Sequence, residues 1–248
     1  MREVCLVIAT SKKSFHNVYP ILQGIDTNII PKQNVIIVSG QEEDDSCCFI
    51  DDYYCKRVTY TGLHLTSFIY VYEHLQEYNS IKWWVMLPDT IQLGGSFFEK
   101  LQEVYSMHLS NNTNTWCVPF INNKLVGRPT MDMGIFSSIH LFNIGDYLRE
   151  MKLTQPYSKN ELEVLKKQLI CNENLVFGLN PCNPGRATRL CLQMQMPHPC
   201  IYVINERDEI IEEVIDNGTR NRIYLSVLDL YKIQRNFKGP DVKLVLDD

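Results

Sequence analysis

Apolar residues gather in short continuous runs along the first hundred residues, and segments with helical spacing separate these runs. The runs cover residues 4–9, the centre of the segment 34–39, and 83–87. Runs of this length without alternating polar positions are typical of strands that are buried on both faces of a sheet. Between them, apolar side chains recur every three to four residues, which predicts helices. These predicted helices cover residues 15–25, 65–78 and 97–109.

The segment 57–60 predicts one more, shorter strand, and the acidic, cysteine-containing segment before it predicts a loop. The resulting order alternates strands and helices, which favours an α/β fold with a mainly parallel central sheet flanked by helices. The second half is less regular. There we predict strands at 116–120, 133–137 and 201–204, and helices at 143–151, 160–170 and 225–237. No repeat or linker divides the chain, so we predict a single domain over 1–248.

Composition narrows the classes of function. The chain of 248 residues has a net charge of −5, which disfavours a general nucleic-acid binder. No stretch approaches the roughly 18 apolar residues of a membrane span. The first apolar run is too short for a signal peptide, so we expect a cytoplasmic protein. Its nine cysteines form no C-x-x-C pair and no zinc-ligand spacing, which favours reduced thiols.

Polar side chains follow the predicted strands at their carboxyl ends, where parallel α/β sheets bind ligands. The first strand ends at Thr10 and Ser11, the second at Ser39, and the strand at 83–87 runs into Asp89. A carboxylate in such a position can hold a divalent metal that is bound to phosphate oxygens. The alternative is that Asp89 caps the following turn.

Three segments together resemble GT-A glycosyltransferases: Ala-Thr-Ser at 9–11, Ile-Pro-x-x-Asn-Val-Ile-Ile-Val-Ser-Gly at 30–40, and Leu-Pro-Asp-Thr at 87–90. The resemblance covers residues 3–110 and implies a GT-A-like fold. It implies a nucleotide diphosphate sugar as donor, such as a UDP-sugar, and a hydroxyl of a glycan as acceptor. It further implies that Asp89 stands at the D-x-D-type motif that binds Mn²⁺ or Mg²⁺. This motif is incomplete here, since residues 87 and 91 are Leu and Ile.

The resemblance makes 1–110 the nucleotide-sugar-binding half and 111–248 the acceptor-side half. In the second half, Arg220 and Arg222 follow a glycine. Arginine makes bidentate contacts to phosphate, which would suit a diphosphate, although a solvated turn is an alternative for this pair. Asp132 precedes a glycine-containing strand and is the first candidate for the base that accepts the proton of the acceptor hydroxyl. Other candidates for this base are Glu161, Glu163, Glu173, His140 and His64.

Two other functions remain open from the sequence. A nucleotidyltransferase that forms sugar nucleotides shares the sheet pattern but would have a glycine-rich loop after the first strand. Residues 11–14 contain no glycine there. A catalytically silent module that binds nucleotide sugars is the second alternative. The chain has no G-x-G-x-x-G, Walker A or G-x-S-x-G motif, which disfavours dehydrogenases, P-loop enzymes and α/β-hydrolases.

Overall fold

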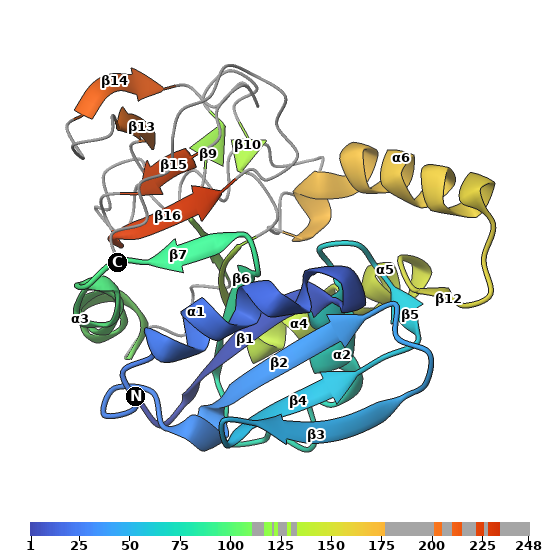
Figure 1. Ribbon diagram of the computed structural model, residues 1–248, viewed down its shortest axis with the longest axis horizontal. Helices are drawn as coiled ribbons and strands as arrows, with labels where there is room; N and C mark the ends of the chain where they lie inside the picture. Colours follow the sequence, from blue (N-terminus) through green and yellow to red (C-terminus); the bar gives the residue numbers. More distant parts are fainter. Residues whose placement is uncertain are drawn as a thin grey trace.

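The computed structural model describes most of the first 176 residues and four short segments after them (Figure 1). The described residues are 1–110, 117–120, 122–123, 128–129, 133–176, 201–204, 210–214, 222–225 and 228–233.

In this part of the chain, seven strands form a central sheet in the order β3–β4–β2–β1–β6–β11–β8. The strands are β1 (Val4–Ser11), β2 (Val35–Gly40), β3 (Ser46–Ile50), β4 (Tyr53–Arg57), β6 (Trp83–Pro88), β8 (Cys117–Pro119) and β11 (Gly134–Ser137). The four central strands β4, β2, β1 and β6 run parallel, as predicted. At one edge β3 pairs antiparallel with β4, and at the other β11 pairs antiparallel with both β6 and β8. The sheet is therefore mixed, with a parallel centre.

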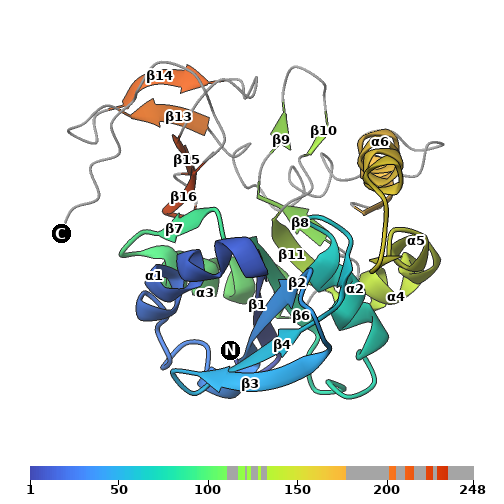
Figure 2. The same ribbon diagram turned by 45° about the vertical axis from the view of Figure 1, so that its right-hand side comes forward.

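Helices cover both faces of this sheet (Figure 2). The helices α1 (Val18–Gln23) and α3 (Phe97–Val104) pack with Leu6 and Ile8 of β1 on one face. The opposite face carries α2 (Thr66–Glu73), α4 (Ser138–Asn143) and α5 (Gly145–Glu150), which pack with Cys5 and Val7. Both faces of β1 are thus buried, which explains why its sequence is continuously apolar instead of alternating.

The segment predicted as a loop around the cysteines is instead an antiparallel hairpin of β3 and β4. The turn uses Asp51 and Asp52, both at positive φ (50° and 67°), as the turns of two-residue hairpins require. Cys48 lies opposite Cys55 across the hairpin, and both are free thiols. The loop prediction was wrong because β3 is half-exposed at an edge and has no continuous apolar run.

Five of the described strands form a second, antiparallel sheet in the order β14–β13–β15–β16–β7. These strands are β7 (Ile91–Leu93), β13 (Ile201–Ile204), β14 (Ile210–Val214), β15 (Arg222–Leu225) and β16 (Leu230–Ile233). The predicted helix at 225–237 was wrong, because a turn at Leu228 and Asp229 (φ 49°) interrupts the segment and β16 follows. In Figure 1 the chain leaves the central sheet after β6 and enters β7, which pairs with β16 of the second sheet.

The other described elements are short apart from one helix. They are β5 (Tyr60–Thr61), β9 (Asn122–Asn123), β10 (Arg128–Pro129), β12 (Leu153–Thr154), α6 (Lys159–Val176), the 3₁₀ segments Lys12–Asn17 and Lys32–Asn34, and the π segment Tyr105–Leu109. Among the described residues, we find no helix with the length and apolar character that crossing a bilayer requires.

Candidate functional site

A pocket of about 450 Å³ opens at the carboxyl ends of β1, β2 and β6. Its walls come from 9–11, 40–41 and 88–90 at these strand ends, and from the loop that leads into α2. This volume lies within the range of small-molecule sites. The position agrees with the rule that ligands bind beyond the carboxyl ends of parallel strands.

Asp89 is held rigidly at the floor of this pocket. The Thr10 hydroxyl donates a hydrogen bond of 2.7 Å to Oδ2 of Asp89, and the Asp89 amide donates to the Ala9 carbonyl at 2.8 Å. Both side chains are buried. The neighbouring Ser11 hydroxyl lies 3.4 Å from that of Ser14, and both serines line the pocket. The structure therefore brings Thr10, Ser11 and Asp89 together around one hollow.

Ser39 does not line this pocket. Its side chain is fully buried, and its hydroxyl donates to the Glu42 carboxylate at 2.5 Å. The residue that reaches the pocket after β2 is Gln41, at φ 62°, whose amide donates to the Tyr157 hydroxyl at 2.8 Å. Gly40 precedes it, and a Cβ there would lie 2.9 Å from Cγ2 of Thr66. The close approach of α2 therefore requires glycine at the end of β2.

His64 forms part of the pocket wall and is positioned by its own loop. Thr66 Oγ1 accepts a hydrogen bond from the Gly62 amide at 3.0 Å and donates to the Leu63 carbonyl at 2.7 Å, while Leu63 adopts φ 56°. Within the described part of the chain, Nε2 of His64 is buried without a hydrogen-bond partner. Burial, together with the positive charge of Lys232, lowers the His64 pKa to about 4, so the ring is neutral at pH 7.

Lys232 comes to this region from the second sheet. It pairs with Ile91 of β7, two residues after Asp89, and its side chain is half-buried. Burial lowers the pKa of its ammonium to about 8. Asp229 secures the start of β16, since its carbonyl accepts from the Gly94 amide at 2.8 Å and its carboxylate from the Ser96 amide at 2.9 Å. Sequence reasoning missed this position of Lys232 because it predicted a helix at 225–237.

The predicted residues of the second half are placed only in part. Asp132 and Arg220 lie outside the described residues, and Arg222 is the first residue of β15. They therefore stay predictions.

Three candidates for the base have other partners. Glu161 accepts hydrogen bonds from the Ser158 amide and hydroxyl at 2.7 and 2.8 Å, which makes it a capping-box residue of α6 and lowers its pKa. Glu163 pairs with Lys166 on the exposed face of the same helix. His140 is buried and stacks on Phe136 in the core. Glu173 lies in α6. Of the candidates that the structure describes, His64 lines the pocket.

The described residues contain no cluster of three or more His, Cys, Asp or Glu side chains arranged as a metal site. Asp89 supplies one carboxylate to the pocket. Mg²⁺ is commonly held by one or two carboxylates together with substrate phosphates and water. Among the described residues, Asp89 therefore fits a metal that the donor diphosphate helps to bind.

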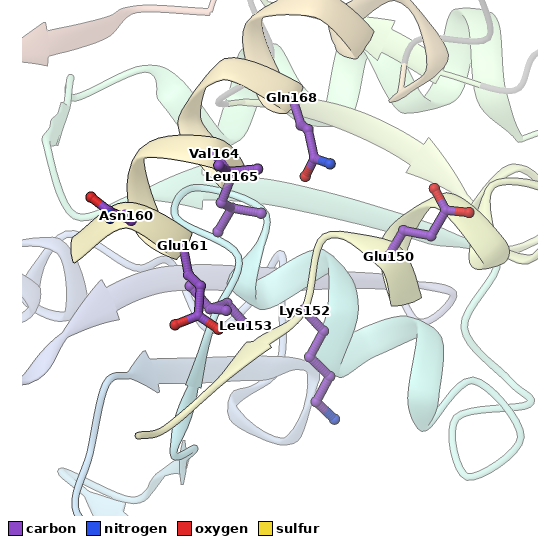
Figure 3. Close-up of a pocket in the computed structure, with 8 residues that line it drawn as sticks. All are labelled: Glu150, Lys152, Leu153, Asn160, Glu161, Val164, Leu165 and Gln168. Carbon is purple, nitrogen blue, oxygen red and sulfur yellow. The ribbon is translucent and has the colours of Figure 1, made fainter. Parts of the chain in front are cut away.

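A second hollow of about 290 Å³ lies between α6 and residues 150–153 (Figure 3). Val164, Leu165 and Gln168 extend from α6 on one side, and Leu153 lies on the other. Lys152 at its rim is paired with Glu73 at 2.6 Å. This hollow lies away from the carboxyl ends of β1, β2 and β6, so we assign the site to the larger of the two pockets.

No protein-family model matches the chain, and no curated protein sequence matches it. Among solved structures, the chain is similar to a glycosyltransferase involved in the glycosylation of the major capsid of PBCV-1. That similarity has a TM-score of 0.42 at 12% identity, and it covers 73% of this chain and 80% of the other. The assignment of a function therefore rests on the residues of the pocket.

Proposed function

We propose that the protein is a glycosyltransferase that moves a sugar from a nucleotide diphosphate sugar to a hydroxyl of a glycan acceptor. The observation that carries this proposal is the pocket of about 450 Å³ at the ends of β1, β2 and β6, in which Thr10 fixes the Asp89 carboxylate. The resemblance of residues 3–110 to GT-A glycosyltransferases supports it from the sequence.

The residues at the strand ends offer contacts for the nucleotide and for the diphosphate of such a donor. Thr10 and Ser11 offer hydroxyls to the nucleotide, which we expect to be uridine, and Asp89 lies where the diphosphate would follow. A Mn²⁺ or Mg²⁺ ion held by Asp89 and the diphosphate would neutralise the charge that develops on the leaving group. The hydrogen bond from the buried Thr10 hydroxyl fixes the orientation of this carboxylate.

The proposed reaction forms a bond between the acceptor oxygen and the anomeric carbon while the bond from that carbon to the diphosphate breaks. The acceptor proton passes to a base, for which Asp132 remains our first candidate. The nucleotide diphosphate leaves with the electron pair of the broken bond. Arg220 and Arg222 are proposed as further contacts to its phosphates.

A thermal-shift screen against UDP-, GDP- and dTDP-sugars, each with Mn²⁺ or with EDTA, tests this proposal. A ligand at 100 times its Kd stabilises the folded chain by about 2.7 kcal/mol, or about 5–10 °C at this chain length. We expect one nucleotide class to raise the melting temperature, with a larger rise in Mn²⁺. No rise with any nucleotide sugar would contradict the proposal.

Two variants separate an enzyme from a silent binding module. Asp89→Asn removes the charge but keeps the shape, and Thr10→Val removes the hydroxyl that holds it. We expect Asp89→Asn to reduce release of the free nucleotide diphosphate at least a hundredfold, and Thr10→Val to reduce it less. Donor binding without any release of nucleotide by the parent chain, across a panel of glycan acceptors, would favour the silent module. Exchange of pyrophosphate into the nucleotide sugar would favour the nucleotidyltransferase.

A further inference from the structure

Two free thiols face each other across the hairpin at the edge of the central sheet. Cys48 of β3 and Cys55 of β4 are directly opposite in the register of these antiparallel strands. Residues that are opposite in such a pair project their side chains from the same face of the sheet. Both lie on the face that α1 and α3 cover, where Cys55 is fully buried and the partly exposed Cys48 packs against the same cluster.

The spacing of the two residues suits a disulfide. Opposite residues in an antiparallel pair have Cα atoms about 4.5–5.5 Å apart, within the range of about 4.4–6.8 Å that disulfides span. Their Cβ atoms, at about 4.5–5.5 Å, must come closer by about 1 Å, since a disulfide needs about 3.5–4.5 Å. The edge strand β3 can make this small adjustment because, among the described strands, it pairs only with β4.

Two other free cysteines with described surroundings lie in different directions. Cys47 is exposed and lies across from Lys56, so it projects from the opposite face of β3. Cys5 is buried in β1 and belongs to the cluster on the opposite face of the sheet. Neither is placed to reach Cys55, so the register of the hairpin selects Cys48 as its partner.

The two thiols differ in their access to reagents. Burial, and after it the neighbouring Cys48 thiol, raises the pKa of Cys55 to about 12, so a dissolved reagent finds little thiolate there. Cys48 is the partly exposed member of the pair and is the one that a reagent meets first. Cys55 then reacts within the protein. Groups held beside each other reach effective concentrations of about 10⁵ M or more, which offsets the small thiolate fraction.

We propose that Cys48 and Cys55 form a reversible disulfide that closes the edge hairpin when the surroundings become oxidising. The oxidant is a small disulfide such as oxidised glutathione. The Cys48 thiolate attacks one sulfur of this disulfide, which forms a mixed disulfide and releases one glutathione thiolate. The Cys55 thiolate then attacks the Cys48 sulfur and releases the second. The protein loses two electrons and two protons, and the small disulfide takes them up as two thiols.

The bond would act on the sheet edge and not on the pocket. Among the described residues that line the pocket, none comes from β3 or β4. An edge strand offers unpaired backbone groups on its outer side and is a place where sheets pair with other chains. A bond between Cys48 and Cys55 keeps β3 fixed to β4. In a reducing compartment such bonds are usually transient, which suits a modification that follows the redox state.

Peptide mapping of the full chain after equilibration with reduced and oxidised glutathione tests the pair. The remaining thiols are first alkylated, and trypsin then leaves residues 33–56 as one peptide that contains Cys47, Cys48 and Cys55. Chymotrypsin cuts this peptide after Phe49 and after the tyrosines at 53 and 54, so only a disulfide keeps its two ends together. We expect a joined fragment, and we expect dithiothreitol to separate it.

Serine variants identify the partners. Cys47→Ser is the matched control, since it changes the adjacent exposed thiol, and it should retain the joined fragment. Cys48→Ser, at the partly exposed position, should remove it while the melting temperature of the reduced protein stays the same. The proposal is overturned if the folded, unmodified chain gives no joined fragment, or if the joined fragment persists in Cys48→Ser.

A comparison with the unfolded chain shows whether the fold places the thiols. The equilibrium constant for closing the bond against glutathione is measured in native buffer and in concentrated urea. We expect it to be at least tenfold larger in the folded chain, and the oxidised protein to melt at a higher temperature than the reduced one. An equal or smaller constant in the folded chain would mean that the hairpin does not hold the two thiols at bonding distance.

Discussion

Replacing Lys232 by methionine should make the protein more stable at pH 7. Burial lowers the pKa of this ammonium from 10.5 to about 8, which means that the fold disfavours its charged form. At about 1.4 kcal/mol for each pKa unit, keeping the charge at pH 7 costs the folded state about 3 kcal/mol. Methionine keeps most of the aliphatic chain and removes the charge, so the variant should recover most of this free energy.

The sign of the pH dependence follows from the same pKa. The folded value lies below the unfolded one, so the unfolded chain binds more protons between about pH 8 and pH 10.5. The free energy of unfolding of the unmodified chain therefore gains about 3 kcal/mol from this group as the pH rises through that window. The advantage of Lys232→Met is complete below pH 8 and disappears above about pH 10.5.

Urea denaturation of both proteins at pH 7 and at pH 10 measures the difference, and the melting temperature at pH 7 should rise by about 6–12 °C. Lys13→Met, on an exposed lysine, should change the stability by less than about 0.5 kcal/mol at either pH. A Lys232→Met protein that is no more stable than the unmodified chain at pH 7 would refute the reasoning. It would mean that the interactions of Lys232 within the fold outweigh the cost of burying its charge.

Three further substitutions test the surroundings of the site. Gly94→Ala would place a Cβ 2.2 Å from the Asp229 carboxylate, so it should lower the free energy of unfolding by about 1–3 kcal/mol; an unchanged urea midpoint would show that β16 is not anchored there. Thr66→Val removes both hydrogen bonds of its hydroxyl and should lower the free energy of unfolding by about 1–3 kcal/mol; an unchanged urea midpoint would show that the loop before α2 does not depend on them. Ser158→Ala should lower the melting temperature slightly through loss of the α6 cap and leave turnover unchanged; a fall in turnover would return Glu161 to the candidates for the base.

The central strands and the floor of the pocket could be predicted because their signals are local. The runs that became β1, β2 and β6 are buried on both faces, so their apolar character is continuous. In a parallel sheet the ends of adjacent strands meet, which is why Thr10 and Asp89, 79 residues apart, share a hydrogen bond.

The second sheet and the other residues of the pocket depend on turns and on pairing between distant segments, which the spacing of apolar residues does not encode. The spacing in 225–237 looks helical, but Asp229 at positive φ turns the chain and the following residues pair with β7. His64 owes its place to Leu63, another residue at positive φ, so no periodic pattern marks it. Ser39 ends a predicted strand correctly, yet its hydroxyl is engaged by Glu42. A strand end fixes where a residue lies, but not which partner its side chain finds.

The connection between β6 and β7 also limits where insertions and deletions can be accepted as the sequence evolves. Pro88 ends a strand of the central sheet and Ile91 begins a strand of the second sheet, so Asp89 and Thr90 are the whole connection. An inserted or deleted residue there would shift the register of β7 against β16, and with it the place of Lys232. Homologues that share this site should therefore vary in length in many loops but keep the spacing between these two strands constant.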